Sequence, residues 1–207
     1  MDIREVMRLR PTLLIGSVPF ASKTVEGILK QPVEFLALNP RTLADVEEDV
    51  RTLARLVDRA GAGDRLIQRM RRALSQVARR ASRIGKRPRV YCEAWPNPRI
   101  SSPPWVAELV RIAGGEMVVQ AGAKVTDEDV ARASPDVIIL AWAATGDRAR
   151  PATAICNPAW KNVPAVKYGR VFVIRDELLN TPGPPLIQGV RELFRAIHAH
   201  KSAEAGK

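Results

Sequence analysis

The sequence predicts an α/β fold of two Rossmann-like lobes joined by one long backbone helix, with the N-terminal lobe incomplete. Short apolar runs alternate with amphipathic segments, as in parallel sheets covered by helices. Residues 64–84 carry the most regular apolar stripe, with steps of three and four. Before this segment only two strands are predicted, which is few for an independent sheet. We therefore expect a partial N-terminal lobe (residues 1–61), a connecting helix (62–85) and a C-terminal α/β lobe (86–207).

The individual elements follow from apolar runs and from the residues that end them. In the first part, Thr42 and Asp45 have the spacing of a capping box at the start of a helix. Later, the apolar run at residues 136–142 is typical of a strand buried on both faces of a parallel sheet. The other predicted strands are 12–15, 33–38, 89–94, 117–119 and 171–174, and the other predicted helices are 21–29, 105–112, 126–133 and one that starts near Pro184.

Composition limits the possible classes of protein. The chain has 207 residues, of which 46% are hydrophobic, and this content is sufficient for a packed core. The formal net charge of +11 suits an anionic partner but equally serves solubility. Because no recognised nucleic-acid fold accompanies this charge, we do not expect a nucleic-acid partner. We interpret the arginines on and after the long helix as a solvated face: Arg65, Arg69, Arg71, Arg72, Arg79, Arg80, Arg83, Arg87 and Arg89.

Signatures of catalysis and of metal binding are missing from the sequence. It contains no nucleophile elbow, phosphate-binding loop or dinucleotide fingerprint. The two histidines, His198 and His200, lie at the C-terminal end, which is a poor place for a metal site. We expect no enzyme activity, no catalytic residues and no metal. Cys92 lies in an apolar strand and is expected to be a buried thiol, although a bridge to Cys156 stays open.

The C-terminal third carries the most specific pattern. Asn157-Pro158-Ala159-Trp160 is followed by a turn at Gly169-Arg170, an apolar strand, and a Pro-Gly-Pro helix entry at residues 182–184. This order resembles periplasmic substrate-binding proteins of vitamin B12 (cobalamin) and iron-siderophore ABC importers, and most of all their cobalamin-binding branch. The segments at residues 90–98 and 134–138 resemble the same family.

The resemblance implies a protein that binds without catalysis. The ligand is expected in the cleft between the lobes, as cobalamin or another corrinoid, or as an iron complex, with no covalent cofactor. It would pass to an ABC transporter permease outside the cytoplasm, in the periplasm or extracellular space. One alternative is an iron-siderophore or haem-binding protein of the same fold. Another is an intracellular interaction module that reuses the fold.

Departures from the family pattern keep these alternatives open. The chain begins after the first strand–helix–strand unit of the family and shows no signal peptide, so as written it is cytoplasmic. A second copy of the chain, in a homodimer, could complete the N-terminal lobe. The positions at which relatives present docking acids fall near Ser22 and Lys161-Asn162, and none of these residues is acidic.

The candidate ligand-binding residues follow from the predicted sheet. Trp95 and Trp142 come at carboxyl ends of parallel strands, where open α/β sheets bind ligands, and a flat indole can stack against a corrin ring. The loop before the last helix could offer free backbone N–H groups to a ligand, although it could equally be an ordinary helix entry, and the tryptophans could be core residues. Trp160 is expected in the core. The full predicted set is Trp95, Pro96, Trp105, Trp142, Asn180, Pro182, Gly183 and Phe20.

Overall fold

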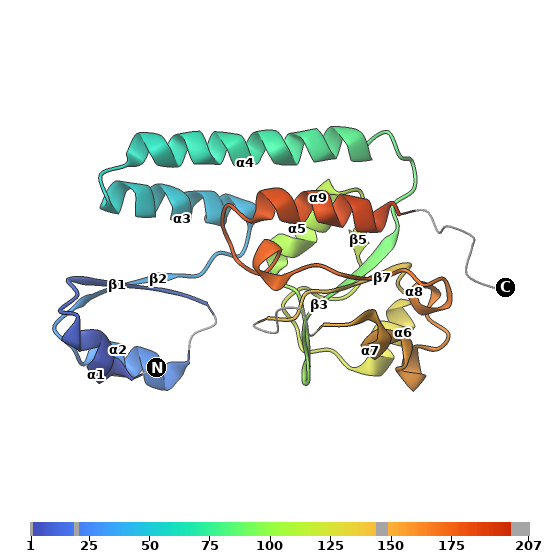
Figure 1. Cartoon of the computed structure of the whole chain (residues 1–207), viewed down its shortest axis with the longest axis horizontal. Coiled ribbons are helices and arrows are strands. Elements are labelled where there is room, and N and C mark those ends of the chain that lie inside the picture. Colours follow the sequence, from blue (N-terminus) through green and yellow to red (C-terminus); the bar gives the residue numbers. More distant parts are fainter. Residues whose placement is uncertain (1, 19–20, 144–148, 200–207) are drawn as a thin grey trace. The chain divides into compact units, whose positions relative to one another are not determined.

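The computed structural model describes residues 2–18, 21–143 and 149–199, and the chain divides into two units at Pro40 (Figure 1). Helices and strands alternate in both units, so the predicted α/β class is confirmed. Residues 41–61, which the sequence places with the N-terminal lobe, group with the second unit because they pack on the long helix that follows them.

The first unit is a small parallel sheet with two helices. Its elements are α1 (Ile3–Arg8), β1 (Leu13–Ser17), α2 (Ser22–Leu29) and β2 (Glu34–Leu38). The two predicted strands pair in parallel, from Leu13 opposite Glu34 to Ser17 opposite Leu38. A parallel pair needs a crossover connection, and α2 provides it. Strand residues here remain partly exposed, as expected for so small a sheet.

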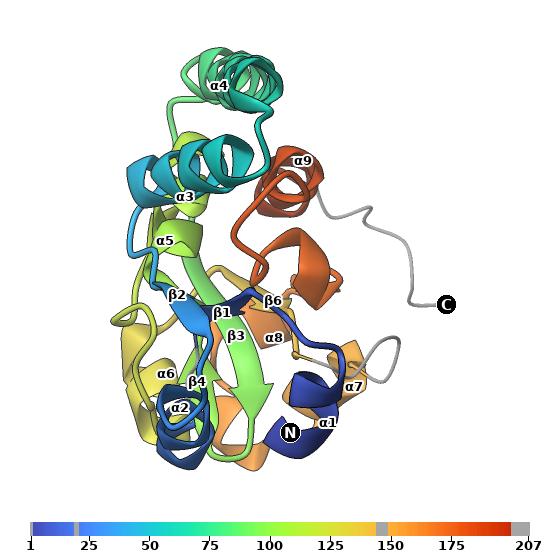
Figure 2. The same cartoon turned by 90° about the vertical axis from the view of Figure 1, so that its left-hand side faces the viewer.

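A helical hairpin begins the second unit. It consists of α3 (Leu43–Leu56) and α4 (Ala60–Ala81), and the capping box predicted at Thr42 is present. Gly63 lets the two helices approach closely, because a Cβ there would lie 2.5 Å from the Cβ of Ala54. The 22-residue helix α4 is the long helix that the sequence predicts, displaced by three or four residues toward the N-terminus. Figures 1 and 2 show α4 lying across both α3 and α9 (Leu186–Ile197).

The sheet of the second unit is built around its longest strand. β3 (Arg89–Pro96) pairs in parallel with β6 (Val137–Leu140), which in turn pairs with β7 (Val171–Val173). On its other edge β3 pairs in parallel with β5 (Glu116–Met117) and antiparallel with β4 (Arg99–Ser101). All four side chains of β6 are buried, which agrees with a central strand that is covered on both faces.

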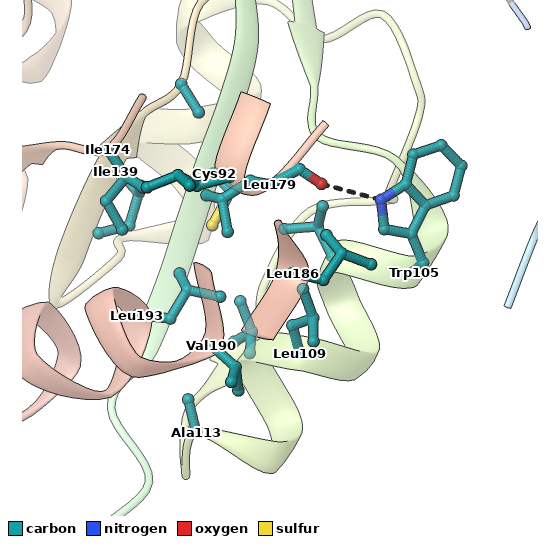
Figure 3. Packing of buried hydrophobic residues seen from close by; sticks show 14 of the residues in the cluster. Cys92, Trp105, Leu109, Ala113, Ile139, Ile174, Leu179, Leu186, Val190 and Leu193 are labelled. Carbon is teal, nitrogen blue, oxygen red and sulfur yellow. Dashed lines mark hydrogen bonds between the residues drawn. The ribbon is translucent and has the colours of Figure 1, made fainter. Parts of the chain in front are cut away.

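Helices cover both faces of this sheet. One face packs on α5 (Pro104–Ile112), α9 and α4, and Cys92, Leu109 and Leu193 meet in this part of the core (Figure 3). The remaining elements are α6 (Asp127–Ala133), α7 (Pro151–Ile155), η2 (Pro158–Trp160), α8 (Pro164–Lys167) and η3 (Asp176–Leu178). The core of the opposite face includes residues from α6, α7, η2 and α8. Trp160 is fully buried there, and its predicted place in the core is confirmed.

Gly189 sets the closest approach between α9 and the segment that follows β7. A Cβ on Gly189 would lie only 1.9 Å from the backbone oxygen of Leu178. We expect Gly189→Ala to lower the free energy of unfolding by about 3 kcal/mol through overpacking. Gly85→Ala is the control, because nothing lies within 4 Å of a Cβ there. Urea unfolding followed by tryptophan fluorescence measures both variants, and equal stabilities would contradict this packing.

The two cysteines are free thiols in different surroundings, so the open alternative of a bridge between them is not realised. Burial raises the pKa of the Cys92 thiol, whereas Cys156 is exposed. We expect one of the two thiols to react with Ellman's reagent in the folded protein, and both in urea. Fast labelling of both thiols without denaturant would contradict the burial of Cys92.

Candidate functional site

Two neighbouring strands of the second unit end side by side at the carboxyl edge of the sheet. The amide of Ala141 donates to the carbonyl of Glu93 (2.8 Å), and the amide of Ala143 donates to that of Ala94 (2.9 Å). Trp95 and Trp142 therefore come from adjacent strand ends, as the sequence predicts. This edge is where open α/β sheets bind their ligands.

A buried carboxylate holds one of these tryptophans. Glu93 is fully buried and accepts three hydrogen bonds, from the Tyr91 hydroxyl (2.8 Å), Arg99 Nη1 (2.7 Å) and Trp142 Nε1 (2.9 Å). Tyr91 and Glu93 lie two residues apart on β3 and so share a face of the sheet. Because the carboxylate is shielded from water, these three hydrogen bonds inside the protein replace the ones that water would otherwise donate.

Arg99, the first residue of β4, connects this carboxylate to the start of α6. Its Nε donates to the carboxylate of Asp127, and its guanidinium lies 4.3 Å from the centre of the Trp160 ring. Burial opposes the charge, but attraction to Glu93 and hydrogen bonds to Glu93 and Asp127 raise the pKa of Arg99. Asp127 also accepts from Asn157 Nδ2 (3.1 Å) and, through its carbonyl, from Trp160 Nε1 (3.1 Å). These residues form one connected polar network beneath the sheet edge.

The tryptophans differ sharply in exposure. Trp95 is 38% exposed, and its indole N–H donates to the carbonyl of Asn97 (2.9 Å). Trp142 is only 8% exposed and Trp105 only 4%. Trp95 therefore offers a ligand far more open surface than Trp142 or Trp105 does.

The loop that precedes α9 is fixed to the same edge. Asn180 Nδ2 donates to the carbonyl of Ala141 at the end of β6 (2.6 Å), and Trp105 Nε1 donates to the carbonyl of Leu179 (2.9 Å, Figure 3). Asn180 Oδ1 is buried and, among the residues that the structure describes, has no hydrogen-bond partner. Gly183 is buried and Pro182 partly buried in this loop. The loop thus presents an unused carbonyl acceptor close to the strand ends.

The structure places most of the predicted site residues in the second unit. Trp95, Pro96, Trp142 and Asn180 come from the strand ends or are bonded to them, whereas Trp105 is joined to the edge only through the 176–185 loop. Phe20 lies outside the described residues. Sequence reasoning missed the Glu93–Arg99 pair, for which the signal was an acid alternating with Tyr91 along an apolar strand.

Within the part of the chain that the structure describes, no group of three or more His, Cys, Asp or Glu side chains could hold a metal ion. His198 Nε2 lies 2.8 Å from the carbonyl of Ala113, and His200 is outside the described residues. Among the described helices, none has the length and apolar character needed to cross a membrane.

The family follows from comparison with known sequences. The family model described as "Periplasmic binding protein" matches residues 2–178. This chain belongs to that family. A relative in Bacillus subtilis (strain 168), the uncharacterized ABC transporter substrate-binding lipoprotein YvrC, is 23% identical over 96% of this chain, which spans 65% of the length of YvrC. The resemblance to substrate-binding proteins of ABC importers is confirmed.

Solved structures share the fold. An ABC transporter substrate-binding protein from Listeria monocytogenes EGD-e has a TM-score of 0.80 at 20% identity, covering 96% of this chain and 81% of its own. The periplasmic haem-binding protein BhuT in complex with two haems scores 0.78 at 20% identity, covering 95% and 78%. The periplasmic vitamin B12-binding protein BtuF of Vibrio cholerae scores 0.73 at 17% identity, also covering 95% and 78%.

Removing the charge of Glu93 should lower the stability of the protein more than breaking an exposed ion pair does. We expect Glu93→Gln to lower the free energy of unfolding by about 3 kcal/mol, because Arg99 then keeps a largely buried charge with one partner fewer. Glu48→Gln, which breaks the exposed Glu48–Arg51 pair, should cost less than about 1 kcal/mol. Urea unfolding measures both variants. Similar losses in the two would show that the Glu93 network contributes little.

Proposed function

We propose that this protein is a solute-binding protein of an ABC importer that binds a corrinoid without catalysing a reaction. The exposed indole of Trp95, at the carboxyl edge of the sheet in a member of the periplasmic binding protein family, is the observation that carries the proposal. An indole offers a flat apolar surface with two rotatable bonds, so stacking on a macrocycle costs little side-chain entropy.

The polar groups at the edge favour a corrinoid over other planar ligands. Asn180 Nδ2 is engaged by the Ala141 carbonyl, which leaves Oδ1 as an unused acceptor. An acceptor suits the amide N–H groups around a corrin ring, whereas the carboxylates of haem need donors or cations. Filling this acceptor would remove the cost of leaving a buried polar group unpaired.

Haem and iron-siderophore complexes are the alternative ligands. BhuT carries two haems and BtuF of Vibrio cholerae is described as a vitamin B12-binding protein, so the same fold serves more than one planar ligand. Trp95 could stack on any of them. The Oδ1 acceptor of Asn180 is the feature that favours a corrinoid over these alternative ligands.

The proposed partner is an ABC transporter permease, with the protein acting outside the cytoplasm as its family does. Of the positions near which relatives carry docking acids, Ser22 begins α2 and Lys161 follows η2. Neither is acidic, so we propose that contact with a permease would use other groups. We also propose that a second copy of the chain completes the first unit in a homodimer. The oligomeric state in solution tests this.

A visible-absorption titration with cobalamin tests the ligand. We expect saturable binding at micromolar ligand, and Trp95→Ala should weaken it about tenfold, since stacking on an aromatic ring contributes roughly 1 kcal/mol. Trp95→Phe should restore most of the affinity. Tyr168→Ala is the control, because Tyr168 is an exposed aromatic residue outside the edge.

Parallel titrations with haem and with a ferric siderophore separate the alternatives. Tighter binding of either one, with the same Trp95 dependence, would move the proposal to that ligand. No binding of the three ligands, or equal losses in Trp95→Ala and Tyr168→Ala, would overturn a stacking site at Trp95.

A further inference from the structure

A groove lined with arginine runs between α4 and α9, both in the second unit. It consists of two adjoining hollows of about 340 Å³ and 570 Å³, which share Gln76 and Arg191. Its arginines come from both walls: Arg69, Arg72, Arg79 and Arg80 from α4, Arg83 from the turn that follows α4, and Arg191 and Arg195 from α9. All of them are exposed. A solvated face on one helix would not explain why the second helix adds arginines to the same hollow.

The arginines of α4 form a line. Positions 69, 72, 76 and 79, of which 76 is Gln, follow steps of three and four, so they share one side of the helix next to its buried stripe, and Arg83 continues the series in the turn after the helix. At 1.5 Å per residue, the helical part of the line, from Arg69 to Arg79, is roughly 15 Å long. Arg191 and Arg195 lie one turn apart on α9 and extend the charge across the groove.

Little of this charge is neutralised within the described part of the chain. The residues that line the two hollows include no Asp or Glu, and the ion pair recorded for these arginines joins Arg195 to Glu192 (2.8 Å). By contrast, Arg71 on α4 makes two hydrogen bonds to Glu47 of α3 (2.8 and 2.5 Å). The groove thus gathers like charges whose repulsion an anion would relieve.

We propose that this groove binds a linear phosphate polymer that carries no bases. One guanidinium group can donate two parallel hydrogen bonds to the oxygens of a phosphate. A row of such groups therefore matches a chain of phosphates. Stacking of nucleic-acid bases requires open aromatic faces. Phe194 is the aromatic residue among those that line the groove. It is partly buried, and the centre of its ring lies 4.7 Å from Arg80 Cζ.

The shape of the groove also favours a chain over a membrane. A flat lipid surface would touch the rims but not the hollow, and binding of helices to membranes usually buries an apolar face between charged residues. The residues that line the groove come from α4, from α9 and from positions next to their ends (Arg83, Pro184 and Pro185), and Trp95 is not among them. The proposal is therefore independent of the ligand proposed above.

Binding of fluorescently labelled inorganic polyphosphate, followed by anisotropy, tests the proposal. The groove variant combines Arg79→Gln, Arg83→Gln and Arg191→Gln. The matched control combines Arg111→Gln, Arg132→Gln and Arg175→Gln, which remove the same charge at exposed positions of the second unit that do not line the groove. We expect roughly a hundredfold weaker binding in the groove variant and less than about threefold in the control.

Salt and competing polyanions complete the test. The slope of log affinity against log salt should fall by about two to three units in the groove variant alone, since three phosphate contacts release fewer counterions. Equal losses in both variants would show a general charge effect and overturn the site. Tighter binding of anionic phosphatidylglycerol vesicles or of single-stranded DNA, at equal phosphate concentration, would overturn the proposed polymer. Far-UV circular dichroism of the variants confirms that the fold is kept.

Discussion

Glu93 is a fully buried carboxylate within β3, opposite the last residue of β6, and a charge in that position is stable only when donors surround it. Tyr91, Arg99 and Trp142 supply those donors from β3, from the β3–β4 hairpin and from the segment after β6. Each of the three must adopt one geometry, because losing a donor would leave a buried charge unpaired. The carboxyl edge of the second unit is consequently fixed before any ligand arrives.

The rest of the edge depends on the same fixed point. Because Trp142 is held by Glu93, the end of β6 keeps its position, and the carbonyl of Ala141 can accept from Asn180. The 176–185 loop is then tied to the sheet at Asn180 and to α5 through Trp105. An edge built in this way is largely pre-formed, so the ligand proposed for it would lose little ordering entropy on binding.

Local patterns in the sequence predict the elements well because each pattern reflects local physics. The apolar run at residues 136–142 predicts β6, and the capping residues Thr42 and Thr126 predict the starts of α3 and α6. The sequence predicts burial of Trp160, but burial of Trp142 could not be predicted, because Trp142 depends on Glu93, which is 49 residues away in sequence. The strand around residues 117–119 is shorter than predicted, since β5 pairs with β3 through only two residues.

The arginines of this chain behave in two opposite ways. Arg99 is partly buried, and two carboxylates and an indole ring surround it, so its charge is matched within the fold. The arginines between α4 and α9 are exposed to water, and the Arg195–Glu192 ion pair and the Arg80–Phe194 ring contact that they make within the described part of the chain contribute little stability. Like charges gathered on one groove repel each other, and the anionic polymer that we propose would relieve that repulsion. Seven of the arginines that the structure describes line the groove, so this polymer would account for part of the net charge of +11, whereas solubility alone would be served equally well by a scattered distribution.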